Sequence, residues 1–176
     1  MEKGMIHLYH GDGKGKTTAA VGLAVRFAGN KERVLFAQFM KDETSGEIDV
    51  LKKIPGIQTK HGKTTKGFYG KMSDEEKATF ASEQEVLLEA VLKEVEGMES
   101  GGLVVLDEIT YAYAWNLIDR KKLECFLQNK PDRIELVMTG RNPEQELLAA
   151  ADYVTEMKCV RHPFERGIGA RKGVEF

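Results

Sequence analysis

The chain has 176 residues, which is enough for one domain with a substantial core. Its 26 lysines and arginines nearly balance 28 aspartates and glutamates, and the net charge of −2 argues against a nucleic-acid-binding domain, which would usually be basic. No apolar stretch approaches the roughly 18 residues that a membrane-spanning helix needs. We therefore expect a single cytoplasmic domain over 1–176, without a secretory leader and with its two cysteines, Cys125 and Cys159, reduced.

Apolar runs predict β-strands at residues 5–9, 33–39, 103–107, 134–139 and 152–157. Helical patterns separate these runs, and strands that alternate with helices indicate a parallel sheet covered on both faces. The run at 103–106 is apolar at every position, as expected for a strand that is buried on both faces. The predicted fold class is therefore α/β, with a mostly parallel sheet flanked by helices.

The helices between these strands have recognisable ends. An apolar stripe at helical spacing stops at Gly29, and its members are Ala19, Ala20, Leu23, Ala24, Phe27 and Ala28. Ser73 and Glu76 form a predicted capping box, and the helix that follows has predicted core positions at Phe80, Leu87, Leu88, Val91, Leu92 and Val95. Asn142, which is followed by Pro143, is the predicted N-cap of a later helix.

The stretch at 41–72 is predicted to be irregular, because it contains several glycines and lysines and shows little periodicity. Long irregular connections in compact domains are often binding loops or lids, and a solvated loop is the alternative. Within this stretch, Phe68 and Tyr69 provide either an apolar face for a flat ligand or a local hydrophobic plug. Farther along the chain, the aromatic residues Tyr111, Tyr113 and Trp115 are expected to pack in or near the core.

A glycine-rich turn directly follows the first predicted strand and precedes a helix. It consists of Gly11, Asp12, Gly13, Lys14, Gly15, Lys16, Thr17 and Thr18. Glycines let backbone N–H groups converge on phosphate oxygens, and the positive end of the following helix points to the same place. Lys16 is predicted to reach the outer phosphates of a nucleoside triphosphate, and Thr17 to place its hydroxyl on Mg²⁺. The alternative is a purely structural turn, since His10 stands where the strict motif has its first glycine.

Polar groups also follow two of the other predicted strands. Asp107 and Glu108 end the strand at 103–107, where a carboxylate beside the phosphate loop can bind Mg²⁺ directly or through water. Arg141 follows the strand at 134–139, and ligands of parallel α/β sheets gather at the carboxyl ends of strands. An arginine there can form charge-assisted hydrogen bonds with phosphate. A helix cap for the carboxylates and a plain surface position for the arginine are the alternatives.

Several of these segments together resemble the ATP:corrinoid adenosyltransferases of the CobA/CobO/BtuR type. The matching segments are 11–20, 104–111, 139–141, 151–157, 161–167 and 170–176, so the resemblance covers most of the chain. It implies a single-domain fold of the P-loop NTPase type, with a RecA-like parallel sheet, and a homodimer.

The resemblance also implies a reaction, namely transfer of the 5′-deoxyadenosyl group of ATP to Co(I) of a corrinoid with release of triphosphate. Lys16 and Arg141 are then the predicted catalytic residues, and the glycine-rich turn holds the triphosphate. Thr17 and Glu108 are the implied ligands of Mg²⁺ (or Mn²⁺), with Asp107 in support. A reduced flavoprotein is the implied electron donor.

The corrinoid side departs from the family pattern. Phe68 matches the phenylalanine of a Phe-x-Trp pair that shields the lower face of the corrin, but Gly70 stands at the tryptophan position. Tyr69 is the candidate replacement, and 41–72 is the predicted corrinoid-side region.

Two other functions are compatible with the same nucleotide site. A small-molecule kinase or ATPase would break a bond at the γ-phosphate and release ADP. An ATP-responsive binding module would bind nucleotide tightly without turnover.

Overall fold

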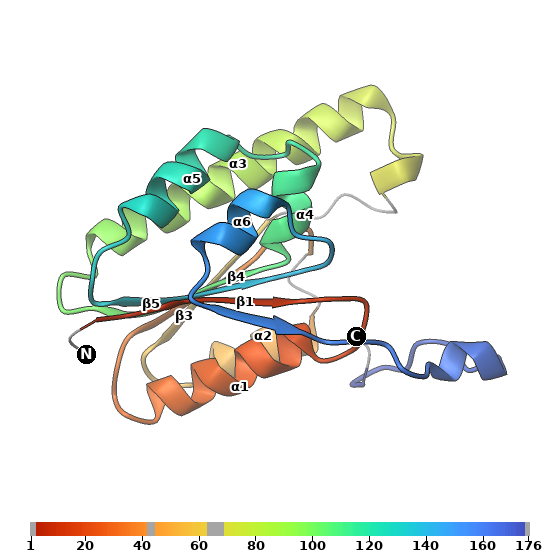
Figure 1. The fold of residues 1–176 in the computed structure, drawn as a ribbon, viewed down its shortest axis with the longest axis horizontal. Coiled ribbons are helices and arrows are strands. Elements are labelled where there is room, and N and C mark those ends of the chain that lie inside the picture. Colours follow the sequence, from red (N-terminus) through yellow and green to blue (C-terminus); the bar gives the residue numbers. More distant parts are fainter. Residues whose placement is uncertain (1–2, 42–44, 63–68, 175–176) are drawn as a thin grey trace.

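A six-stranded parallel β-sheet forms the centre of the molecule (Figure 1). The computed structural model describes residues 3–41, 45–62 and 69–174. The strands are β1 (Ile6–His10), β2 (Val34–Gln38), β3 (Ile57–His61), β4 (Gly102–Asp107), β5 (Ile134–Thr139) and β6 (Tyr153–Glu156). Their order in the sheet is β3-β2-β4-β5-β1-β6, and every pairing is parallel. The predicted α/β class with a parallel sheet is confirmed.

Helices cover both faces of this sheet. They are α1 (Lys16–Ala28), α2 (Gly46–Leu51), α3 (Asp74–Glu96), α4 (Ile109–Ala114), α5 (Arg120–Gln128) and α6 (Gln145–Ala150), with short 3₁₀ helices η1 (Tyr69–Lys71) and η2 (Pro163–Arg166). In Figure 1, α1 and α2 lie on one face, and α3, α4, α5 and α6 lie on the other. Each face has its own core, because alternate residues of a strand point in opposite directions. Phe36 of β2 packs in the core on the α1 face, whereas Leu35 packs in the core that contains Leu88 of α3.

The central strands are more deeply buried than one edge of the sheet. Every residue of β2 and β4 is buried, as the apolar run at 103–106 predicts. By contrast, every residue of the edge strand β6 is exposed. Beyond β6 the chain runs outward to η2, away from the layers of helices (Figure 1). β1 therefore lies between the buried centre of the sheet and an exposed edge.

Most predicted helix ends are confirmed. α1 stops at Ala28, directly before Gly29. The capping box of α3 is present, since the Glu76 N–H donates to Ser73 Oγ at 3.2 Å and the Ser73 N–H donates to Glu76 Oε2 at 2.7 Å.

Both cysteines are free thiols. Within the described ranges, no helix is both long enough and apolar enough to cross a membrane.

Two predictions about local structure are wrong. Asn142 is not an N-cap, because α6 begins at Gln145 and has Glu144 as its N-cap. Asn142 instead has φ of 46°, a left-handed conformation that asparagine adopts more readily than most residues. The stretch at 41–72 is not irregular throughout, because it contains α2 and β3. Only Ile57 of β3 is buried, so this edge strand lacks the apolar alternation by which strands are recognised.

Candidate functional site

The turn between β1 and α1 fits closely against the chain that leaves β6. Gly11 has φ of 108°, in the left-handed region that favours glycine. A Cβ at Gly13 would lie 2.7 Å from the Met157 carbonyl oxygen, and a Cβ at Gly11 would clash with the same oxygen. The Gly13 N–H donates to that oxygen at 2.7 Å. Backbone geometry therefore requires glycine at both positions, independently of any ligand.

Lys16 begins α1, and its side chain folds back into the turn. Its ammonium donates to the carbonyl oxygens of Gly11 at 2.8 Å and Gly13 at 2.7 Å. Lys16 is only 7% exposed, and burial lowers its pKa, as does the positive charge of Arg141. The ammonium is thus held inside the predicted phosphate cradle, where phosphate oxygens can replace the two carbonyls as acceptors.

Asp107, at the end of β4, is fully buried and surrounded by hydrogen-bond donors. Its Oδ1 accepts hydrogen bonds from Thr17 Oγ1 at 2.9 Å and Thr139 Oγ1 at 2.6 Å. Its Oδ2 accepts from Gln38 Nε2 at 3.0 Å and Lys41 Nζ at 3.3 Å. A carboxylate offers about four acceptor positions, so these donors use its full capacity. The geometry suits Asp107 to orienting Thr17 rather than to binding a metal ion directly.

Glu108 combines an unusual backbone conformation with an unpaired buried oxygen. Its φ is 59°, and its N–H donates to Thr139 Oγ1 at 2.9 Å. Its Oε2 is buried and has no hydrogen-bond partner among the residues that the structure describes. Although Glu108 occupies the N-cap position of α4, its side chain forms no capping hydrogen bond. Strained backbone and unsatisfied polar atoms persist mainly where they serve a ligand.

Charges around Glu108 oppose one another. Burial raises the pKa of Glu108, and the neighbouring Asp107 carboxylate raises it further. The positive charges of Lys41, Lys16 and Arg141 act in the opposite direction. A buried carboxylate oxygen without a partner is costly, and a cation bound to it would remove that cost.

The side chains of Thr17 and Glu108 suit a magnesium ion. Because the Thr17 hydroxyl donates its proton to Asp107, its oxygen lone pairs can contact a cation. Glu108 adds the unpaired carboxylate oxygen. Over the described ranges, no three His, Cys, Asp or Glu side chains are grouped so that they could hold a metal ion. Mg²⁺ often binds through one or two protein oxygens and completes its shell with phosphate oxygens and water, which matches the pair found here.

Arg141 reaches the same edge of the sheet from the end of β5. Its side chain is exposed, and its backbone carbonyl accepts a hydrogen bond from Thr110 Oγ1 at 2.9 Å. The Cys159 N–H, which lies 3.0 Å from Asp12 Oδ1, lowers the pKa of that carboxyl, and the positive charge of Arg141 contributes. Arg141 therefore adds a positive charge near the glycine-rich turn.

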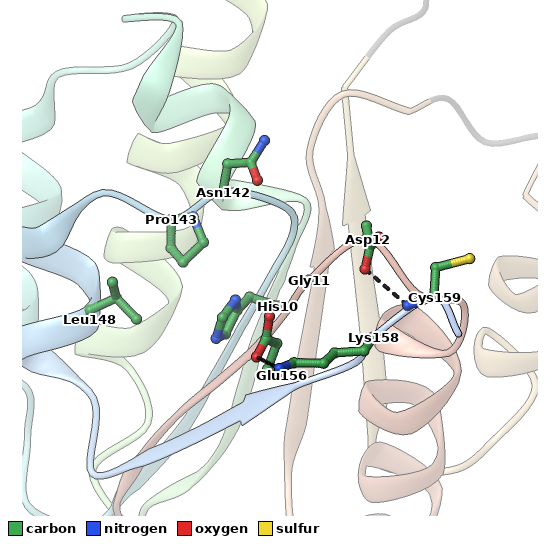
Figure 2. Close-up of a pocket in the computed structure, with 9 residues that line it drawn as sticks. All are labelled: His10, Gly11, Asp12, Asn142, Pro143, Leu148, Glu156, Lys158 and Cys159. Atoms are coloured by element: carbon green, nitrogen blue, oxygen red, sulfur yellow. Dashed lines mark hydrogen bonds and ion pairs between the residues drawn. The ribbon is translucent and has the colours of Figure 1, made fainter. Parts of the chain in front are cut away.

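A pocket of about 640 Å³ lies beside the glycine-rich turn (Figure 2). Its lining residues come from the ends of β1 and β6 and from the segment between β5 and the middle of α6: His10, Gly11, Asp12, Asn142, Pro143, Leu148, Glu156, Lys158 and Cys159. Glu156 and Lys158 form an ion pair at 3.3 Å on its wall. Its size is typical of small-molecule sites, and it shares Gly11 and Asp12 with the predicted phosphate loop.

The whole sequence matches one family of enzymes. The sequence model of the family described as ATP:corrinoid adenosyltransferase BtuR/CobO/CobP matches residues 2–176. The chain belongs to this family. Membership makes it a transferase of the corrinoid adenosyltransferase class, with ATP and a corrinoid as substrates.

Individual members of the adenosyltransferase family are similar over nearly the full chain. A corrinoid adenosyltransferase of Sinorhizobium sp. is 34% identical over 99% of this chain and 81% of its own length. One from Escherichia coli K12 is 33% identical over 99% of this chain and 87% of its own length. Corrinoid adenosyltransferase CobA of Salmonella typhimurium is 32% identical, again over 99% and 87%.

A distant solved structure supports the fold alone. ATPases 2 and 3 of EssC from Geobacillus thermodenitrificans superpose on this adenosyltransferase with a TM-score of 0.54 and 14% sequence identity. The match covers 98% of this chain but only 36% of that one. The shared architecture agrees with the predicted P-loop NTPase-type fold.

In this adenosyltransferase, aromatic side chains gather where α4 ends. Tyr69 stacks on Trp115, with ring centroids 4.9 Å apart and planes inclined by 18°, and Tyr111 tilts against Trp115 at 5.1 Å. Trp115, at the C-cap of α4, is 42% exposed, so of the predicted positions in or near the core it occupies one near the core, stacked on a Tyr69 ring that packs against the core cluster. Tyr113, by contrast, is fully buried. Phe68, the other residue predicted to contact the corrinoid, lies outside the described residues.

Sequence reasoning misses Gln38 and Lys41. They lie at the end of β2 and just beyond it, and the parallel register pairs Gln38 with Asp107 of β4. The strand order that makes β2 and β4 neighbours is not encoded in any local motif. A usable signal was present, since polar residues at the carboxyl ends of parallel strands tend to face the ligand.

Proposed function

We propose that this adenosyltransferase transfers the 5′-deoxyadenosyl group of ATP to Co(I) of a corrinoid and releases triphosphate. Membership of the family supports the acceptor and the donor. The observation that supports the location of the site is the buried Oε2 of Glu108, which has no hydrogen-bond partner among the described residues. Glu108 directly follows Asp107, whose carboxylate accepts a hydrogen bond from the Thr17 hydroxyl. Together these groups make one edge of the sheet suited to a metal–triphosphate.

The reaction breaks the bond between C5′ and oxygen rather than a bond to phosphorus. The electron pair of Co(I) forms the Co–C bond, and the electron pair of the C5′–O bond leaves with the triphosphate. Negative charge therefore grows on the leaving oxygen, and preorganised positive groups lower the barrier by stabilising that charge. Lys16, in the glycine-rich turn, and Arg141, at the end of β5, are the residues proposed to do so.

Thr17 and Glu108 are the residues proposed to hold Mg²⁺. The ion would supply further stabilisation of charge on the departing triphosphate. Asp107 has a supporting role in this proposal. It accepts the hydrogen bond that the Thr17 hydroxyl donates, so the lone pairs of the Thr17 oxygen can point to the metal ion. This differs from direct metal ligation by all three residues.

The corrinoid is proposed to lie against the aromatic cluster at the end of α4. Trp115 is partly exposed to solvent. Glu108 and Trp115 lie at the two ends of the short helix α4, as its N-cap and C-cap. Stacking on Tyr69 keeps the indole ring in a fixed orientation. Trp115 and Tyr69 thus provide an aromatic surface on the side where Gly70 replaces the family's tryptophan. Electrons for the reduction to Co(I) are proposed to come from a reduced flavoprotein.

A homodimer is proposed to cover the exposed edge of the sheet. β6 and the segment beyond it leave large apolar side chains in solvent: Tyr153, Val154, Val160, Phe164, Ile168 and Val174. Apolar surface of this kind on one region of a protein is typical of an interface. A second copy of the chain is the proposed partner.

The decisive experiment identifies the phosphate product. Protein, ATP, MgCl₂ and chemically reduced cobalamin are incubated anaerobically, and the expected products are a Co–C bonded cobalamin and triphosphate in equal amounts. ADP with orthophosphate would indicate a kinase or ATPase instead. Tight ATP binding without any turnover would indicate a binding module.

A further inference from the structure

Lys41 brings a positive charge to the carboxylate that orients Thr17. It lies just beyond β2, and its ammonium is 3.3 Å from Asp107 Oδ2. The same oxygen accepts the Gln38 amide at 3.0 Å. Because Gln38 pairs with Asp107 in the sheet, the chain that follows Gln38 passes over the end of β4. Lys41 thus reaches the edge that carries Thr17 and Glu108.

Negative charge dominates the surroundings of this ammonium. The carboxylates of Asp107, Glu108 and Glu47 all act on Lys41. Gln38 links two of them, since its amide also donates to Glu47 Oε1 at 2.9 Å. Lys41 therefore balances charge at the place where a divalent cation would meet Glu108.

Lys41 also differs from the other partners of Asp107. Thr17, Thr139 and Gln38 form shorter contacts, and each of these side chains is neutral. The side chain of Lys41 is 33% exposed and has a long flexible stem, so its ammonium can leave Asp107 for another acceptor without crossing the core. Among the described partners of Asp107, it alone combines charge with access to solvent.

We propose that Lys41 is an exchangeable counter-ion of the metal site. In the nucleotide-free protein its ammonium neutralises the Asp107–Glu108 pair and opposes binding of a free divalent cation. When a metal–triphosphate arrives, the ammonium moves from Asp107 to a phosphate oxygen and joins Lys16 and Arg141. This inference rests on the proposed function, because it needs a triphosphate at this edge.

The consequence is an order of binding. The cation enters with the nucleotide rather than before it, because only the nucleotide offers Lys41 a new acceptor. Metal and nucleotide then promote one another's binding. By thermodynamic linkage, the metal raises the affinity for the nucleotide by the same factor as the nucleotide raises the affinity for the metal.

The test compares two binding constants in the absence of corrinoid. Binding of Mn²⁺ to the nucleotide-free protein is measured by electron paramagnetic resonance, and binding of MgATP by calorimetry. Lys41→Met keeps most of the stem and removes the charge. We expect Mn²⁺ to bind about fivefold tighter or more, and MgATP to bind about fivefold weaker or more. Lys41→Gln is a second neutral variant, and Lys121→Met on the exposed surface of α5 is the matched control.

Opposite changes in the two constants support the proposal, and Lys41→Arg, which keeps the charge, is expected to change both much less. Unchanged Mn²⁺ binding, or a loss of affinity for both ligands in Lys41→Met and Lys41→Gln, would overturn it and leave Lys41 a structural partner of Asp107. The proposed function fails separately, if the wild-type protein releases ADP instead of triphosphate.

Discussion

The edge around the glycine-rich turn and the region beyond β6 are built in opposite ways. At the first, Asp107 is fully buried with every acceptor position used, and Lys16 is 7% exposed. In the second, Val160 is 94% exposed and Phe164 is 73% exposed. The proposed nucleotide site is therefore organised by the chain itself, whereas the C-terminal region leaves apolar side chains exposed, which the proposed partner copy would cover.

The largest effect is expected from Lys16→Ala, which removes the only charge buried inside the turn. A hydrogen bond between charged groups contributes about 1.5–3 kcal/mol, so ATP affinity should fall by about 100-fold. Calorimetry with ATP checks this, with Lys121→Ala as the control. Wild-type affinity in the Lys16 variant would show that the triphosphate lies elsewhere.

A second test breaks the hydrogen bonds inside this edge. In Asp107→Asn, an amide NH₂ group replaces one carboxylate oxygen, so it would face hydrogen-bond donors that find an acceptor in the wild type. We expect the free energy of unfolding to fall by about 2 kcal/mol, because buried donors lose their acceptor. Urea denaturation measures the change, and Asp49→Asn, at an exposed position of α2, is the control. Equal stability of the two variants would contradict the view that this edge is held together by Asp107.

Trp115→Ala tests the aromatic cluster, which is intermediate between the two regions. The variant should raise the KM for reduced corrinoid about fivefold and leave ATP affinity unchanged, since aromatic contacts contribute about 0.5–1.5 kcal/mol. Val86→Ala, at an exposed position of α3, serves as the control in steady-state assays. If ATP affinity fell instead, the cluster would belong to the nucleotide side.

Glu108→Gln is expected to have a smaller effect on stability, and one that depends on pH. Burial and the Asp107 charge raise the pKa of Glu108 in the folded protein. Stability linked to this group is therefore greatest at low pH, and it is lost as the pH rises through the raised pKa. Without metal or nucleotide, the Tm of Glu108→Gln should exceed that of the wild type by a margin that grows as the pH rises above the ordinary glutamate pKa of 4.5 and levels off above the raised pKa.

Thermal unfolding in the presence of a chelator measures this margin, with Glu96→Gln as the control. A margin that shrinks with rising pH would mean that the Glu108 carboxylate has a partner in the free protein. In a separate measurement without chelator, added MgATP should stabilise the wild type more than the variant, because the variant cannot offer a carboxylate to the cation.

The smallest effect on monomer stability is expected from Phe164→Ser. Because Phe164 is 73% exposed, the free energy of unfolding of the monomer should change by no more than about 0.5 kcal/mol. The mass in solution, measured by light scattering, should nevertheless shift from dimer to monomer. If the wild-type protein were monomeric even at high concentration, the proposal that a second copy covers this region would be wrong.

Sequence reasoning succeeded where a pattern has a direct local cause. The apolar run at 103–106 and the Ser73–Glu76 capping box each determine their own conformation, and both are confirmed. β3 was missed because an edge strand with one buried residue need not alternate. Whether Trp115 lies in the core or only near it was left open by the sequence, because the end of α4 at Trp115 cannot be located from composition.

The site was predictable in part for a similar reason. The glycine-rich turn and the Asp107–Glu108 pair can be recognised from spacing alone, although their functional roles stay predictions. For Lys41 the only signal was its place just beyond a predicted strand, and its contact with Asp107 could not be foreseen, since that contact depends on β2 and β4 being neighbours. The unpaired oxygen of Glu108 depends on φ of 59° and on packing, which no short motif specifies.

The seam between the glycine-rich turn and the strand that ends at Glu156 has a mechanical consequence. The Gly13 N–H donates a hydrogen bond to the Met157 carbonyl, and the Asp12 carboxylate accepts one from the Cys159 N–H. A displacement of the C-terminal segment would therefore be transmitted to the proposed phosphate loop through a few bonds. In the proposed homodimer, this short connection would couple subunit association to ATP affinity, so that each would affect the other.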